Sequence, residues 1–194
     1  MIDYQRIIDK YYPAGSGLRD IYMRHCRAVA DEALAIAERL GLPLDRERIE
    51  AAAMLHDIGI FRTNAPSILC RGSEPYIAHG IIGREILLSE GVDGEIADVA
   101  ARHTGSGLTL EEIECQHLPL PPGDYCPQTL LQRLVCYADK FYSKSGSMER
   151  KSLERVREQM ARFGSESLGR FEGLVLEFGD ERGAIRGSSA VHGR

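Results

Sequence analysis

Histidine and aspartate side chains recur where helical spacing directs them towards the apolar, packed side of a helix. Five predicted helices each carry at least one such residue. These residues are His25, His56, His79, His103 and Asp139, and Asp57 joins the set as the neighbour of His56. Burying a single group of this kind costs several kcal/mol unless it is paired. Six in one small domain need a common partner, and a metal centre supplies one.

The composition of this set indicates which metals it suits. Imidazole favours Fe, Zn, Cu and Ni, whereas carboxylate favours harder ions, so the mixture fits first-row divalent metals. Six ligands exceed one tetrahedral site. They suit two ions about 3.5–4 Å apart with a bridging carboxylate and a bridging water. Taken singly, each histidine also fits a hydrogen-bonded core residue, and each aspartate a buried cap or a paired charge.

The elements that must position these residues are helices. Apolar residues recur at spacings of three and four, no segment alternates with period two, and the fold class predicted is all-α. Helices are predicted from Asp20 as N-cap to Gly41, from Asp45 to about Gly59, from about Ser73 to Gly91, and over about 128–143. Two more begin at Asp93 and at a capping box formed by Thr109 and Glu112. The last two lie within 149–178. Prolines make 118–127 a loop.

Domain organisation and setting follow from composition. Residues 1–178 are predicted to form a single domain, and the polar tail 179–194 to be poorly ordered. The net charge of −5 argues against a nucleic-acid duplex as partner. No stretch approaches the ~20 apolar residues that span a bilayer, and the N-terminus lacks a secretory pattern. Five cysteines without a C-x-x-C pair indicate reduced thiols, so a cytoplasmic protein without membrane contact is expected.

The order of the motif residues carries a family resemblance. His25, the run Leu55-His56-Asp57-Ile58-Gly59 and Asp139 resemble the H…HD…D signature of the HD superfamily of metal-dependent phosphohydrolases. The resemblance covers roughly residues 18–145. It implies an HD-type helical bundle, here with two extra C-terminal helices.

The resemblance also implies how the ligands divide. His25, His56, Asp57 and Asp139 would form one metal site, while His79 and His103 would complete a second one with Asp57 bridging. The implied cofactor is two divalent ions per chain, with iron or manganese expected first and Mg, Zn, Ni or Co as further candidates.

Two sets of segments resemble two different subfamilies. Residues 102–109 and 138–140 resemble bacterial HD hydrolases that split diadenosine tetraphosphate symmetrically. Residues 107–112, together with the later 118–119 and 125–127, look more like a group of uncharacterised HDIG phosphohydrolases. The HD-GYP cyclic-dinucleotide phosphodiesterases fit less well, because their paired histidines and Gly-Tyr-Pro are missing here.

The resemblance implies hydrolysis of a small phosphorylated substrate, a nucleotide first of all. Asp57 and Lys140 are the expected catalytic residues, and Lys140, Arg62, Arg102 and Thr104 the expected substrate ligands. The plain alternative for each cation is a solvated surface charge, and for Thr104 a hydrogen bond to its own backbone. A homodimer is compatible with the sequence.

Two other functions use the same residues. HD-type di-iron oxygenases bind their metals with the same six ligand types, and the ligand set alone does not separate them from hydrolases. The segments 102–109 and 138–140 favour hydrolysis. A non-catalytic, metal-bound nucleotide sensor is the second alternative.

Overall fold

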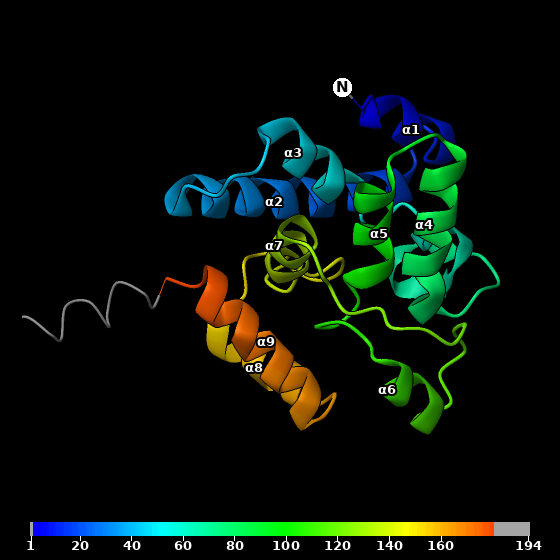
Figure 1. The fold of residues 1–194 in the computed structure, drawn as a ribbon. Helices are drawn as coiled ribbons and strands as arrows, with labels where there is room; N and C mark the ends of the chain where they lie inside the picture. The colour runs from blue at the N-terminus through cyan, green and yellow to red at the C-terminus, as the bar shows by residue number, and fades with distance from the viewer. Residues whose placement is uncertain (1, 181–194) are drawn as a thin grey trace, which may run out of the picture.

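The computed structural model describes residues 2–180, so the predicted tail lies outside the described residues from 181 onward. Its α-helices are α1 (Tyr4–Tyr11), α2 (Gly17–Leu40), α3 (Arg46–Leu55), α4 (His79–Ser89), α5 (Gly94–Arg102), α6 (Leu110–Cys115), α7 (Leu130–Asp139), α8 (Leu153–Ala161) and α9 (Ser165–Phe178). The all-α prediction is confirmed (Figure 1). None of these helices has the length and apolar character needed to cross a membrane.

Side-chain caps decide where several helices begin. Asp45 and Asp93 accept hydrogen bonds from the backbone N–H groups of the first turns of α3 and α5, as predicted. The capping box at Thr109 is confirmed for α6. The prediction of Asp20 as the cap of α2 is wrong, because the Ser16 side chain caps a helix that starts at Gly17. Asp20 lies within the first turn instead.

Three predicted helices are shorter than expected, and one of them is α7, which covers Leu130–Asp139 where about 128–143 was predicted. The α-helix α3 ends at Leu55, and the run from His56 turns into a 3-10 segment at Ile60–Arg62. The helix predicted from about Ser73 begins only at His79, because Pro75 has extended backbone (ψ 142°) and a 3-10 turn at Tyr76–Ala78 follows it.

Two elements were not predicted. Helix α1 buries Ile7 and Ile8 and is followed by the buried Tyr12, whose hydroxyl donates to the Ile58 carbonyl at 3.0 Å. A two-stranded antiparallel sheet pairs β1 (Asn64–Ala65) with β2 (Cys70–Arg71) inside the predicted loop. Two-residue strands are too short to produce an alternating pattern.

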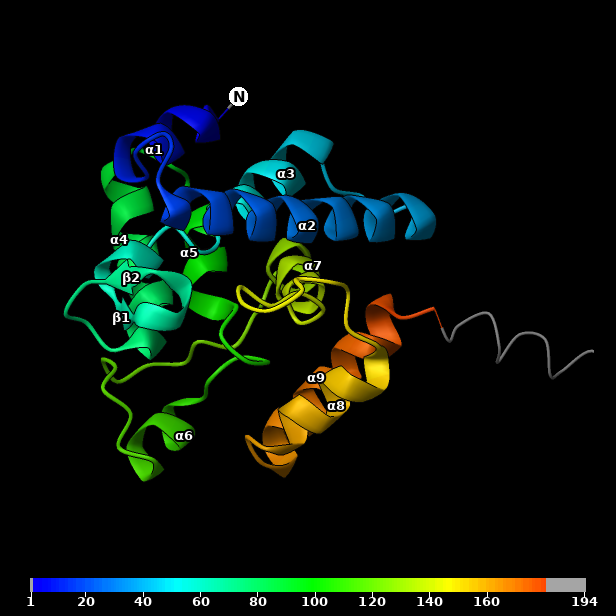
Figure 2. The same cartoon turned by 180° about the vertical axis from the view of Figure 1, so that it is seen from behind.

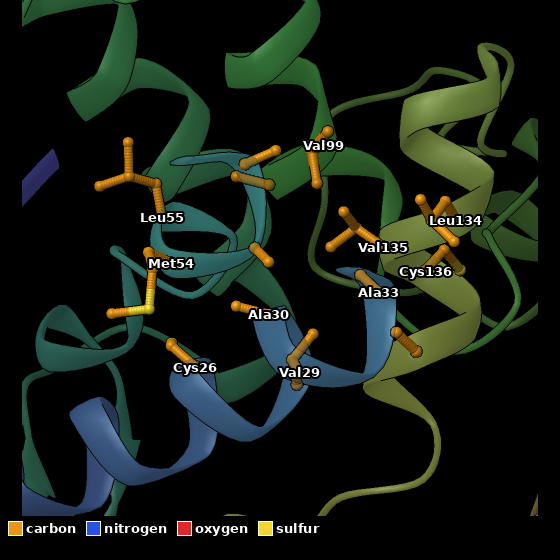
Figure 3. Packing of buried hydrophobic residues seen from close by; sticks show 14 of the residues in the cluster. Cys26, Val29, Ala30, Ala33, Met54, Leu55, Val99, Leu134, Val135 and Cys136 are labelled. Carbon is orange, nitrogen blue, oxygen red and sulfur yellow. The ribbon is translucent and has the colours of Figure 1, made fainter. Parts of the chain in front are cut away.

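Helix α7 lies at the centre of the bundle, in contact with α2, α3 and α5 (Figures 1 and 2). Close-packed apolar side chains join these helices, among them Val29 and Ala33 of α2, Val99 of α5 and Val135 of α7 (Figure 3). Helices α8 and α9 run side by side and α9 packs on α7. The core therefore fixes the elements that carry the predicted ligands, which are α2, the end of α3, α5, α7 and, through its contact with α5, α4.

Gly59 allows the turn after α3 to lie directly against α4. A Cβ at this position would lie 2.3 Å from the His79 carbonyl oxygen and 2.6 Å from the Gly83 nitrogen. Both atoms belong to the backbone and cannot move aside, so only glycine fits. This close approach of the two backbones brings the side chains of Asp57 and His79 next to each other.

Candidate metal centre

The structure brings all six predicted ligands together in the interior. His25 comes from α2, His79 from the first residue of α4, and Asp139 from the last residue of α7. His56 and Asp57 follow α3, and His103 follows α5. All six are buried, and the most accessible, Asp139, is only 8% exposed. Their donor atoms form three overlapping groups of three, in each of which the atoms lie within 4.8 Å of one another.

Asp57 sits between two pairs of histidines and presents one oxygen to each pair. Its Oδ2 lies 3.2 Å from His25 Nε2 and 3.1 Å from His56 Nε2. Its Oδ1 lies 3.5 Å from His79 Nε2 and 3.4 Å from His103 Nε2. Both oxygens are buried, and among the described residues neither makes a hydrogen bond of good geometry, although charged and polar nitrogens surround them. A carboxylate that bridges two cations would occupy this position.

Backbone carbonyls fix the tautomer of three histidines. The Nδ1 atoms of His56 and His79 each lie 2.6 Å from the carbonyl oxygen three residues earlier, and that of His103 lies 2.7 Å from its counterpart. A carbonyl only accepts hydrogen bonds, so each Nδ1 carries the proton. The Nε2 atoms then face the centre, which is the arrangement typical of metal-binding histidines.

No proton lies between the Nε2 atoms of His79 and His103. Their Nε2 atoms lie 3.0 Å apart. Burial lowers the pKa of His79 to about 3 and also lowers the pKa of His103, so both rings are neutral at pH 7. Two nitrogen lone pairs therefore face each other, and a cation between the rings would remove their repulsion. The donor set thus fits a divalent metal.

The other half of the centre is more strongly charged. Burial alone would raise the pKa of Asp57, but Lys144 and His56 hold it well below its usual range. Burial would lower the pKa of His56, yet the adjacent Asp57 raises it well above the ordinary value. Without metal, an imidazolium at His56 and the Lys144 ammonium neutralise Asp57.

Lys140 makes hydrogen bonds to two of the predicted ligand residues. Its Nζ donates to Asp139 Oδ2 and to the His103 carbonyl oxygen, both at 2.7 Å. The opposite oxygen of Asp139, Oδ1, lies 3.1 Å from His25 Nε2. Lys140 is 7% exposed, so its charge is used to orient Asp139.

Lys144 is a functional candidate that the sequence reasoning missed. Its Nζ lies 2.7 Å from Asp57 Oδ2, and its side chain is 13% exposed. Burial favours the neutral amine, but Asp57 outweighs this and raises the lysine pKa well above its usual value. The only signal in the sequence was a lysine five residues after Asp139, just beyond the helix predicted over about 128–143.

A pocket of about 650 Å³ opens beside the centre. His79, His103 and Asp139 form part of its lining, together with Thr104 and three lysines. Other lining residues come from α8 and the turn after it. The lysines are Lys140, Lys144 and Lys151, and the nearby apolar and aromatic residues include Tyr76, Met160 and Phe163.

The structure does not bring the two predicted arginines into this pocket. Arg62 is exposed, with Glu74 4.0 Å away. The Arg102 guanidinium donates to the carbonyl oxygens of Asp124 and Cys126, at 3.2 and 2.7 Å. Arg102 therefore anchors the proline-rich loop, although its neighbour His103 faces the centre.

Comparison with known proteins decides the family. The HD domain family matches residues 22–143, which is more than half of the chain and includes all six clustered residues. The chain belongs to the HD domain family. The matched range contains His25, the His56-Asp57 pair and Asp139, which are the residues that carried the resemblance.

Two curated relatives each match part of this chain. A tRNA (cytidine(56)-2'-O)-methyltransferase of Picrophilus torridus is 37% identical over 134 residues, covering 69% of this chain and 35% of that protein. An uncharacterized protein of Methanocaldococcus jannaschii is 40% identical over 121 residues, covering 60% of this chain and 63% of that protein. This chain thus spans about a third of the methyltransferase and less than two thirds of the second relative.

Solved structures show the same fold at low identity. The HD domain of the L. monocytogenes phosphodiesterase PgpH superposes with a TM-score of 0.53 at 16% identity, covering 96% of this chain and 100% of that chain. The same domain in complex with cyclic-di-AMP gives a TM-score of 0.51 at 15% identity, covering all of both chains.

Proposed function

We propose that this HD domain is a metal-dependent phosphohydrolase that cleaves a phosphoester or phosphoanhydride bond of a nucleotide or similar small phosphate compound. The observation that carries the proposal is the position of Asp57, with one oxygen towards each histidine pair beside a lysine-lined pocket. Family membership supports it, and so does a shared fold with a phosphodiesterase domain that binds cyclic-di-AMP.

The six clustered residues would hold two divalent ions, iron or manganese first of all. His25, His56, Asp57 and Asp139 would hold one ion, and His79 and His103 would hold the other together with Asp57. When bound, such ions supply Lewis acidity and a water whose pKa lies near neutrality. The chain contributes a fixed set of donors, and backbone carbonyls already set the tautomers of His56, His79 and His103.

The pocket residues divide the remaining work. Lys140 is a positioning residue for Asp139. Lys144 shares Asp57 Oδ2 with the histidines, so once that carboxylate serves as a ligand its ammonium is free to bind a phosphate oxygen in the pocket. Thr104 lines the same pocket and its hydroxyl can donate to the substrate.

The lysine-lined pocket also favours hydrolysis over the oxygenase alternative. Cationic side chains beside the centre select an anionic substrate and stabilise charge on phosphate oxygens. The single domain over 1–178, the cytoplasmic setting and the homodimer stay predictions. No methyltransferase activity is assigned to this chain, because it spans only about a third of the Picrophilus torridus methyltransferase.

A substrate screen tests the proposed function. Protein loaded with Mn²⁺ or Fe²⁺ is incubated with nucleoside mono- and diphosphates, dinucleoside polyphosphates, cyclic dinucleotides and p-nitrophenyl phosphate. We expect release of phosphate or nucleotide from at least one compound, lost on chelation and restored by metal. Substrate-dependent oxygen uptake without phosphate release would instead establish the oxygenase. Tight nucleotide binding with neither reaction would establish the sensor.

A further inference from the structure

One pocket lysine lies apart from the metal centre. Lys151 precedes α8, outside the residues that match the HD family. It is half-buried in the pocket lining, and its Nζ donates to Gln159 Oε1 at 3.2 Å. Both side chains belong to the part of the pocket that the C-terminal helices add.

Lys151 differs from the other two pocket lysines in its lack of a counter-ion. Lys140 is paired with Asp139 and Lys144 with Asp57, each at 2.7 Å. Within residues 2–180, no carboxylate lies within ion-pair distance of the Lys151 ammonium. A half-buried cation without a partner is costly unless an anion joins it.

The charges around Lys151 would also favour an anion bound beside it. Burial lowers the pKa of Lys151 to about 8. The charges of Lys140, Lys144 and Arg155 act in the same direction, and Asp139 opposes them. An anion bound beside Lys151 would offset both the burial and the repulsion between the lysines. The amide of Gln159 adds a hydrogen-bonding group at the same place.

We infer that Lys151 and Gln159 form a subsite for a second phosphate group, so that the substrate carries two linked phosphates. One phosphate lies at the metal centre and the other at this wall of the pocket. The inference rests on the proposed function, because it places the first phosphate at that centre. The apolar side chains of Met160 and Phe163, which line the same pocket, provide contact area for the organic group attached to the phosphates.

Binding of two non-hydrolysable ligands tests the subsite without relying on turnover. Methylphosphonate and methylenediphosphonate are titrated calorimetrically into Mn²⁺-loaded protein at saturating metal, with metal content checked after each titration. We expect methylenediphosphonate to bind more tightly to the wild type. Lys151→Met is expected to weaken its binding about tenfold, because a charge-assisted hydrogen bond is lost, and to change methylphosphonate binding less than about twofold.

Two further variants make the test specific. Lys151→Arg keeps the charge and should restore most of the binding. Arg46→Met removes one exposed charge from α3, outside the pocket, and should leave both ligands unaffected. Equal affinity of the wild type for the two ligands, or an equal effect of Lys151→Met on both, would overturn the subsite while metal-dependent methylphosphonate binding still supports the proposed function. Binding of neither ligand would contradict both.

Discussion

Asp57→Asn is expected to lower metal-dependent hydrolysis at least about a thousandfold, the loss of several kcal/mol of stabilisation that bound metals provide in such reactions. The amide preserves the volume of the side chain but removes the charge that faces all four histidines. Metal content should fall with activity, because each half of the centre uses one oxygen of this carboxylate. Initial rates of phosphate release and elemental analysis of the same samples measure both effects.

Asp31→Asn is the matched control for this prediction. Asp31 is exposed on α2, the helix that carries His25, so the change removes the same charge without touching the centre. Its activity and metal content should equal those of the wild type. Far-UV circular dichroism is expected to show the same helical content in both variants. An Asp57→Asn protein that retains a tenth or more of the activity would refute the role of Asp57.

Lys144→Met is expected to reduce hydrolysis about a hundredfold while the protein keeps its metal. Removing one group that stabilises developing charge on a transferred phosphate costs about this much. The ammonium and a metal ion compete for Asp57 Oδ2, so the variant should bind metal at least as tightly as the wild type. Steady-state kinetics and a metal titration of the apo-protein separate the two effects.

Lys140→Met is expected to respond to excess metal differently from Lys144→Met. Lys140 holds Asp139 and the His103 carbonyl, so its loss should weaken metal binding first, and excess metal should restore part of the activity. Excess metal should not rescue Lys144→Met. If excess metal rescued both variants equally, Lys144 would be a second support for the ligands and not a phosphate-binding residue.

Helical periodicity could predict which of the clustered side chains point to the core, because the direction of a side chain on a helix depends on local sequence spacing. A histidine three or four positions from buried apolar residues points to the core whatever the rest of the chain does, as for His56 and His103. Which oxygen of Asp57 faces which histidine pair depends on how four helices and a turn pack together. The resemblance implied that Asp57 bridges, and the spacing of residues alone did not.

The substrate-facing side of the site was harder to predict. Arg62 and Arg102 are close to motif residues in sequence, but neighbouring side chains on a helix point in different directions, and neither arginine lines the pocket. Lys144 and Lys151 reach the pocket from irregular segments after α7, where no period exists to orient a side chain. Such residues are found from tertiary packing.

Metal content per chain tests the central claim of a dinuclear centre most directly. Elemental analysis is made on the wild type and on His79→Ala after reconstitution with Fe²⁺ or Mn²⁺. The account predicts about two ions per chain in the wild type and about one in the variant, because His79 belongs to the half of the centre that faces Asp57 Oδ1. At most one ion per chain, unchanged in His79→Ala, would contradict it and make His79 a structural histidine.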